Sequence, residues 1–245
     1  MTSEIGRPFV YDKYTEVDGE KYIYLNDDNP LIAYTYHDIS FVAQPIYGPE
    51  QNKRARVVPV PLMMTDEWPR LIENEDLCRL PPPSYEFGFI GQANYAGRQV
   101  LAHLDLENYL FEDTNPIYNL PTEEKREKIK AYLLATSACE FTFCPRGIGS
   151  SSFRLYQAFM VGSIPIVTGM NDYPFSNVVD WDKMCIRGEL KILPQLIRKA
   201  KEMSTGQRLA MSAEGRMFWE SYCKHDELYR HIQEIVRNHE KGLPV

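Results

Sequence analysis

Strand-like runs alternate with helical segments from residue 85 onwards, and this alternation restricts the fold more than any other feature of the 245-residue chain. Strands in such a pattern are joined by right-handed crossovers and form a parallel sheet that carries helices on its faces. We therefore predict an α/β fold with a parallel sheet. The expected strands span 85–91, 140–144 and 164–169, and the expected helices span 96–110, 122–138, 151–162, 194–203, 205–222 and 226–240.

A run of three prolines at residues 81–83 marks a boundary, because consecutive prolines cannot lie inside a helix or a central strand. We therefore predict two domains, residues 1–80 and residues 81–245. Residues 1–80 contain short strand-like runs separated by polar and proline-rich segments, which is typical of strands and loops. These runs span 21–25, 31–37 and 56–62.

The composition excludes several classes of partner. The chain is 44% hydrophobic and 25% charged, as in ordinary soluble proteins, and its net charge is −7. An acidic chain lacks the basic face that nucleic acids and anionic membranes require, so we expect no nucleic-acid partner. No stretch approaches the ~18 apolar residues of a membrane helix, and no signal peptide precedes the first polar segment. We therefore expect no membrane segment.

Cysteine and histidine spacing predicts no metal site. The five cysteines are widely spaced and include no C-x-x-C pair, and the five histidines form no H-x-x-x-H pair. The acidic residues at 105–107 and 112–114 match a D-x-D motif only weakly, so we interpret them as surface residues. We expect no metal ligands and no required cofactor, with a divalent metal as the open alternative.

The loop at residues 144–152 joins a predicted strand to a predicted helix and has the composition of an anion site. Gly147 and Gly149 allow a positive φ and a close approach of the backbone to a ligand. One of the serines at 150–152 can cap the helix. The free N–H groups of the first helical turn bind anions, and the helix dipole strengthens that binding.

Two arginines accompany this loop. Arg146 lies within it, and Arg154 lies in the first turn of the helix, where the dipole disfavours a cation by ~0.3–1 kcal/mol. Arg154 therefore needs an anion or a carboxylate nearby, and a diphosphate can accept bidentate guanidinium hydrogen bonds. The alternative is a structural loop whose arginines pair with acids. Gln157, one turn later, either meets a ribose hydroxyl or is an exposed helix residue.

Two common nucleotide motifs are absent. Neither G-x-x-x-x-G-K-[ST] nor G-x-G-x-x-G occurs, which argues against a nucleoside triphosphatase and a dinucleotide oxidoreductase. The residues that are present, from "FCPRGIGSSSFRLYQAFMVGSIPIV" to "NDYPFSNVVDWDKMCI", resemble the exostosin family of glycosyltransferases. The shared motifs, in order, are Cys144-Pro145-Arg146-Gly147, Ser152-Phe153-Arg154, Ile164-Pro165-Ile166-Val167 and the segment from Pro174 to Trp181. "FGFIGQ" at 87–92 resembles the family's first donor-domain strand.

The resemblance implies a GT-B architecture, in which residues 81–245 form a Rossmann-like domain that binds a nucleotide-sugar donor and residues 1–80 form an abbreviated α/β part on the acceptor side. The implied reaction is inverting transfer of a sugar, for instance from a UDP-sugar, to a hydroxyl of a glycan or glycoconjugate acceptor. Matched residue by residue, together with the ends of the predicted strands, the expected donor-binding residues are Gly91, Arg146, Gly147, Ser151, Ser152, Arg154, Gln157 and Asp172.

A catalytic base is expected from the N-terminal part. His37 and Asp38 lie at the end of the strand-like run 31–37, a position where catalytic groups are often found, and histidine titrates near neutral pH. A surface His-Asp turn is the alternative, and Asp172 is a second candidate for the base. Glycosyltransferases of this type stabilise the leaving diphosphate with basic side chains and helix N–H groups, which agrees with the expectation that no metal is required.

Two further interpretations stay open. A noncatalytic nucleotide-sugar-binding module, or a partner subunit of a glycosyltransferase complex, would explain the short N-terminal part and the glutamine at Gln157, where the family usually has an acid. The second interpretation is a structural domain that binds phosphate. Animal members of the family usually carry an N-terminal membrane helix, so its absence here leads us to expect a cytoplasmic protein of a bacterium, or of a virus in its host. A homo-oligomer is also open.

Overall fold

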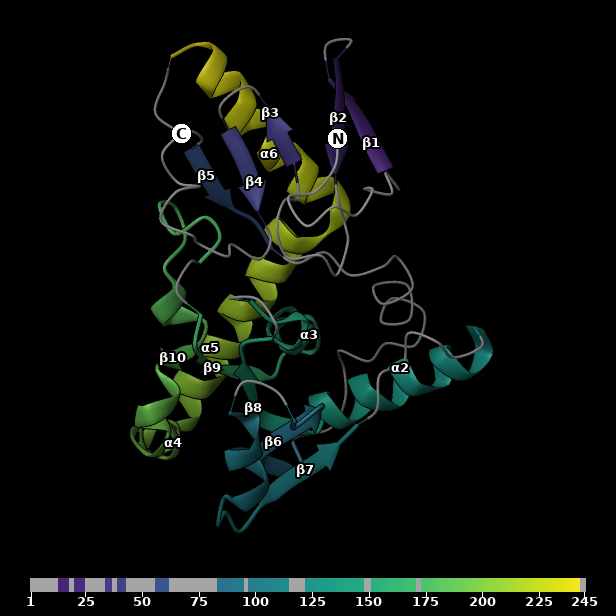
Figure 1. Cartoon of the computed structure of the whole chain (residues 1–245). Coiled ribbons are helices and arrows are strands. Elements are labelled where there is room, and N and C mark those ends of the chain that lie inside the picture. Colours follow the sequence, from purple (N-terminus) through teal and green to yellow (C-terminus); the bar gives the residue numbers. More distant parts are fainter. Residues whose placement is uncertain are drawn as a thin grey trace.

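A five-stranded parallel sheet forms the centre of the protein. The computed structural model describes residues 13–17, 20–24, 34–36, 39–42, 56–61, 83–94, 97–114, 122–147, 151–170 and 173–242. The strands are β6 (Tyr85–Gly91), β7 (Tyr109–Asp113), β8 (Cys139–Pro145), β9 (Ile164–Thr168) and β10 (Ile186–Gly188). They lie in the order β10-β9-β8-β6-β7, and every pairing is parallel (Figure 1). The predicted α/β class is confirmed.

The strand order creates a switch point between β6 and β8. The chain runs from β6 outward to β7 and then returns to the other side of β6, where β8, β9 and β10 follow. This is a doubly wound, Rossmann-like order, in which ligands bind beyond the carboxyl ends of the two strands that flank the reversal. In this protein those strands end at Gly91 and Pro145.

Helices cover both faces of the sheet. One face packs against α2 (Thr122–Ser137) and α3 (Phe153–Val161), and the other packs against the 3-10 helix η3 (Arg98–His103) and α4 (Leu193–Glu202). The remaining helical elements are η4 (Trp181–Lys183), η5 (Leu190–Ile192), α5 (Thr205–Phe218), the π-helix η6 (Trp219–Cys223) and α6 (His225–Glu240). No helix among the described residues is both long and apolar enough to cross a membrane.

Burial on both faces explains why the strands are almost continuously apolar. In β8, Phe141 and Phe143 pack into the core on the η3 and α4 side, whereas Cys144 packs into the core on the α3 side. The ring centroid of Phe87 in β6 lies 5.5 Å from that of Phe141 and 5.8 Å from that of Phe143. A sheet with two covered faces requires such runs, because neither set of alternating side chains meets solvent.

One predicted helix is wrong in most of its length. Residues 96–110 contain the short helix η3 and the start of strand β7, which the sequence analysis did not predict. Strand β7 pairs with β6, and the ring centroid of Phe111 lies 5.7 Å from that of Phe89. Pairing with a strand distant in sequence has therefore overridden a pattern of apolar residues that resembled one face of a helix. The three-residue strand β10 was not predicted either.

The N-terminal part contributes two small sheets among the described residues. β1 (Lys13–Val17) pairs with β2 (Glu20–Tyr24), and β3 (Tyr34–Tyr36), β4 (Ile39–Val42) and β5 (Arg56–Pro59) form the other sheet. The runs predicted at 21–25, 31–37 and 56–62 contain β2, β3 and β5 in large part. Val60 follows β5 and is buried in one core with residues of α2, α3 and α6. The division at residues 80 and 81 stays a prediction.

Arg208 of α5 ties the start of the central strands to the turn between α4 and α5. Its Nη1 lies 2.6 Å from Glu140 Oε2, its Nη2 lies 3.5 Å from Glu86 Oε1, and its Nε donates to the Met203 carbonyl at 3.1 Å. We expect Arg208→Met to lower the free energy of unfolding by about 2–3 kcal/mol in urea titrations, because it leaves half-buried carboxylates without their partner.

The matched control is Arg230→Met on α6, because Arg230 is exposed and pairs with Glu227 within the same helix. Such a pair contributes about 0.5 kcal/mol or less. Equal losses of stability in the two variants would contradict the clamping role of Arg208.

Candidate functional site

Strand β6 ends at a glycine that makes room for an arginine. Gly91 has φ +145°, a conformation that residues with a Cβ rarely adopt. A Cβ built at this position would lie 1.7 Å from Nη2 of Arg154 and 2.7 Å from its Cζ. The guanidinium of Arg154 therefore rests directly on the end of β6, where only glycine fits.

Arg154 is held in that place by groups that do not neutralise it. Its Nε donates to the Ile90 carbonyl at 2.7 Å, and its Cζ lies 4.7 Å from the ring centroid of Phe89. The residue is 9% exposed. Over the described part of the chain, no carboxylate forms an ion pair with Arg154. A carbonyl and a ring stabilise a buried cation only partly, so the site favours an anion.

The N-terminus of α3 opens at the same place. Ser152 occupies the N-cap position with extended backbone, and its side chain forms no capping hydrogen bond. Ser151 is 2% exposed, and its Oγ lies 3.4 Å from the Tyr156 hydroxyl. Ser152 thus occupies the N-cap position, which the sequence analysis assigned to one of the three serines. Its side chain does not accept a hydrogen bond from a backbone N–H of the first turn, as a capping serine usually does. Among the described residues, the N–H of Leu155 donates to the Ser152 carbonyl at 3.1 Å, and no described group accepts from the N–H groups of Phe153 and Arg154.

The described residues at the two ends of the loop after β8 form backbone hydrogen bonds. The N–H of Arg146 donates to the Thr168 carbonyl at 2.9 Å, and the N–H of Gly147 donates to the Ser151 carbonyl at 2.9 Å. Gly147 does not adopt the positive φ that a glycine allows. Glycine is suited to this position by space instead, since a Cβ would lie 3.2 Å from the Ser151 oxygen. The Arg146 side chain is exposed and passes Gly169, whose Cβ would lie 3.0 Å from Arg146 Cδ.

Gln157 is buried one turn after Arg154, which excludes the alternative of an exposed helix glutamine. It is 7% exposed, and its side chain forms no hydrogen bond with the described residues. A polar side chain in that position can bind a ligand hydroxyl without first breaking a protein hydrogen bond.

Arg98 is a site residue that sequence reasoning missed. It lies at the start of η3, is 6% exposed, and donates to the carbonyls of Gln92, Pro145 and Arg146 at 3.0, 3.3 and 2.8 Å. Its Nε also donates to the Arg146 carbonyl at 3.2 Å. The one sequence signal for a place of Arg98 in the site is that it follows soon after Gly91. Residues 96–110, which include Arg98, were instead predicted to form a regular helix.

Both buried guanidiniums act on the thiol of Cys144 at the end of β8. Burial raises the pKa of this thiol to about 12, and the charges of Arg154 and Arg98 oppose the rise. Burial also raises the pKa of the Tyr132 hydroxyl on α2, and the charge of Arg154 again opposes the rise. Two positive charges therefore converge on the switch point, and Cys144 is a neutral thiol that cannot serve as a nucleophile near pH 7.

We expect Cys144 to resist alkylation in the native protein at pH 8, because about 10⁻⁴ of a thiol with this pKa is ionised. In urea the same thiol should react fully, as peptide mapping by mass spectrometry would show. Its folded pKa of about 12 lies above its ordinary value of 9.0, so the unfolded state loses the proton first as pH rises. The free energy of unfolding should therefore fall as the pH rises from about 9 to about 12. Rapid native alkylation at pH 8 would contradict this account.

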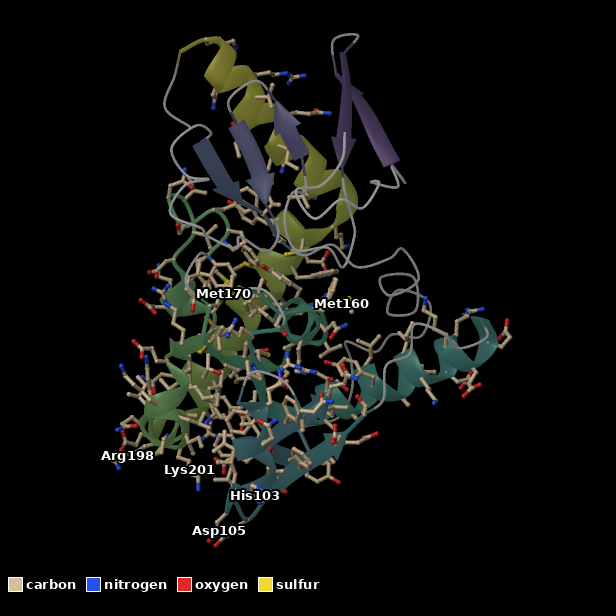
Figure 2. All side chains as sticks on the ribbon, viewed as in Figure 1. His103, Asp105, Met160, Met170, Arg198 and Lys201 are labelled. Atoms are coloured by element: carbon tan, nitrogen blue, oxygen red, sulfur yellow. The ribbon has the colours of Figure 1, made fainter. Side chains whose placement is uncertain are left out.

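Three predicted site residues, His37, Asp38 and Asp172, lie outside the described residues, so their roles stay predictions. The acidic motifs do not form a site among the described residues. Asp113 accepts a hydrogen bond from the Ala93 N–H at 2.9 Å, and Asp105 is exposed near His103 at the outer edge of the fold (Figure 2). Within the described residues, no group of three or more His, Cys, Asp or Glu side chains could hold a metal ion.

The central part of the chain is similar to known glycosyltransferase families. Residues 98–202 match the family described as the RXYLT1 C-terminal domain. Exostosin-1b of Danio rerio is 30% identical over 84 residues, which are 33% of this chain and 11% of that protein. Exostosin-1 of Bos taurus is 26% identical over 121 residues, which are 42% of this chain and 16% of that protein.

The chain thus spans between one tenth and one fifth of the length of these curated relatives. Among solved structures, the C-terminal domain of a group 1 family glycosyl transferase from Francisella tularensis aligns with a TM-score of 0.38 at 15% identity. The alignment covers 66% of this chain and 96% of that one. These sequence matches support the resemblance of the chain to the exostosin family of glycosyltransferases.

Proposed function

We propose that this protein is an inverting glycosyltransferase that moves a sugar from a nucleoside-diphosphate sugar to a hydroxyl of a glycan or glycoconjugate acceptor. The observation that carries the proposal is the buried Arg154 guanidinium, which rests on Gly91 beside the N-terminus of α3 at the switch point. The match of residues 98–202 to the RXYLT1 C-terminal domain and the identity to exostosin-1 proteins support it.

The diphosphate of the donor is the anion that this arrangement suits best. A phosphate can accept two hydrogen bonds from a guanidinium, while the N–H groups of a helix N-terminus bind a second set of its oxygens. Arg146 has an exposed side chain at the same end of the sheet, and it can cover the solvent side of the diphosphate. We assign to Gln157, which is buried one turn after Arg154, the binding of a ribose hydroxyl, a role that an acid usually has in this family.

The reaction needs only one displacement. The acceptor oxygen forms a bond to the anomeric carbon while the bond from that carbon to the diphosphate oxygen breaks, and the acceptor proton passes to a base. The leaving diphosphate gains negative charge in the transition state, and fixed positive groups lower the energy of that charge. We assign this task to Arg154 and the N-terminus of α3, and we propose His37 or Asp38 as the base, with Asp172 as the second candidate.

The proposal is tested by a panel of UDP-, GDP- and other nucleotide sugars offered with glycan acceptors, with release of the nucleoside diphosphate as the measurement. We expect one donor to be consumed, and we expect EDTA to leave the rate unchanged because arginines replace the metal. Binding without turnover across the whole panel would instead favour a noncatalytic module. Absence of nucleotide binding, together with stabilisation by inorganic phosphate as strong as by any nucleotide, would favour a structural phosphate site.

A further inference from the structure

Strands β6 and β8 separate before they end. Their pairing runs from Tyr85 opposite Cys139 to Gly88 opposite Thr142, and it stops there, although β6 continues to Gly91 and β8 to Pro145. The outer pairings continue to the ends of both strands, with β7 on one side and β9 on the other. The carbonyl groups that face the opened gap therefore need donors other than the neighbouring strand.

Two arginines supply those donors, one from each crossover. Arg154, from the connection between β8 and β9, donates to the carbonyl of Ile90 in β6. Arg98, from the connection between β6 and β7, donates to the carbonyls of Pro145 and Arg146 at the end of β8 and to that of Gln92 beyond β6. Arg98 thus bridges the two loops that emerge from the gap.

The bridge affects the place where an anion would bind. Carbonyl oxygens at the carboxyl end of a strand carry partial negative charge, which repels a diphosphate, and a guanidinium bound to them offsets that charge. Arg98 also holds the Arg146 carbonyl by two hydrogen bonds, and the next residue along, Gly147, closes the turn to Ser151. A shift of Arg98 would therefore move the loop that leads into α3.

Resting on the proposed function, we infer that Arg98 is a positioning residue of the nucleotide-sugar site: its guanidinium clamps the carbonyls of Gln92, Pro145 and Arg146 and so sets the loop before α3 for the diphosphate. Arg98 acts through these carbonyls and through the positive charge that it adds to the switch point. A lysine at this position keeps the charge but cannot donate to three separated carbonyls from a planar fork.

Arg208 offers a matched control at the opposite end of the same strands. It too donates to three carbonyls, those of Met203, Ala200 and Lys201, but its carboxylate partners lie at the beginnings of β6 and β8. Arg98→Lys and Arg208→Lys therefore remove equivalent guanidinium clamps from the two ends of the strands. A purely structural role for Arg98 predicts that the two variants behave alike.

The test titrates UDP and GDP into the wild type and both variants by calorimetry, well below each melting temperature. We expect Arg98→Lys to raise the Kd of the preferred diphosphate about tenfold or more, because small displacements of binding groups have effects of this size. We expect Arg208→Lys to lower the melting temperature and to leave the Kd within about twofold of the wild type. An unchanged Kd in Arg98→Lys would overturn the inference. Arg98→Gln serves for the same comparison should the lysine variant not fold.

Hydrogen exchange separates this inference from the proposed function. The Arg146 and Gly147 amides donate to Thr168 and Ser151, and their exchange should become faster in Arg98→Lys but not in Arg208→Lys. Unchanged exchange in both variants would overturn the clamp. If the wild type bound no nucleoside diphosphate, the proposed function would fail, and faster exchange would still establish the clamp on the loop.

Discussion

Arg154→Ala is expected to lower kcat/KM for the nucleotide-sugar donor by about 10²-fold or more, which corresponds to about 2.7 kcal/mol of transition-state stabilisation. Arg154 is 9% exposed, lies in the first turn of α3 and has no carboxylate partner among the described residues. Its interaction with the departing diphosphate strengthens as charge develops on that group, so its loss should lower kcat more than it raises KM. Steady-state kinetics with the preferred donor would measure both constants.

Two variants act as controls for Arg154→Ala. Arg154→Lys keeps the charge but not the bidentate geometry, so it should recover only part of the activity. Arg198→Ala removes an exposed arginine of α4. The side chain of Arg198 lies at the outer edge of the fold, far from Met160 of α3 (Figure 2). Its kinetics should match those of the wild type. A kcat/KM of Arg154→Ala equal to that of the wild type would contradict a role of Arg154 in the reaction.

Gly91→Ala is expected to abolish measurable diphosphate binding, with a fall of about 10²-fold or more in affinity, because misplacement of a binding group by an ångström has effects of this size. A methyl group at this position would lie 1.7 Å from Nη2 of Arg154, so the guanidinium must leave the end of β6. Alanine at φ +145° is also strained, and we expect the free energy of unfolding to fall by about 1–3 kcal/mol. Calorimetry and urea titration would measure the two effects separately.

Gly206→Ala is the control for this substitution. Gly206 lies in the first turn of α5, and the closest atom to a Cβ built there is the Ser204 Oγ at 4.0 Å. Alanine in an unstrained helical position should raise stability by about 0.5–1 kcal/mol and leave nucleotide binding unchanged. Nucleotide affinity in Gly91→Ala equal to that of the control would contradict the dependence of the site on Arg154.

The parts of the fold that local sequence determines were predicted well. Strand β6 spans the expected residues, and α3 ends at Gly162, whose φ of +83° and backbone hydrogen bond to the Phe159 carbonyl fit a helix C-cap. Both signals come from adjacent residues. The sequence also indicated that Arg154 needs an anion or a carboxylate nearby, because its position against the helix dipole can be recognised without tertiary structure.

The contacts that build the site could not be predicted in this way. Arg154 donates to a carbonyl 64 residues earlier, and Arg98 donates to carbonyls 47 and 48 residues later. Strand β7 likewise depends on its pairing with β6. Such contacts arise only once the sheet order brings distant loops together, and no local pattern of residue types encodes that order.

The central claim, that Arg154 and the N-terminus of α3 hold the diphosphate of a nucleotide-sugar donor, is tested most directly by calorimetry with UDP, UMP, GDP and GMP. We predict that the wild type binds one diphosphate at least about tenfold more tightly than its monophosphate, and that Arg154→Ala removes this difference. Equal affinity of the wild type for diphosphate and monophosphate, or a preference that persists in Arg154→Ala, would contradict the account.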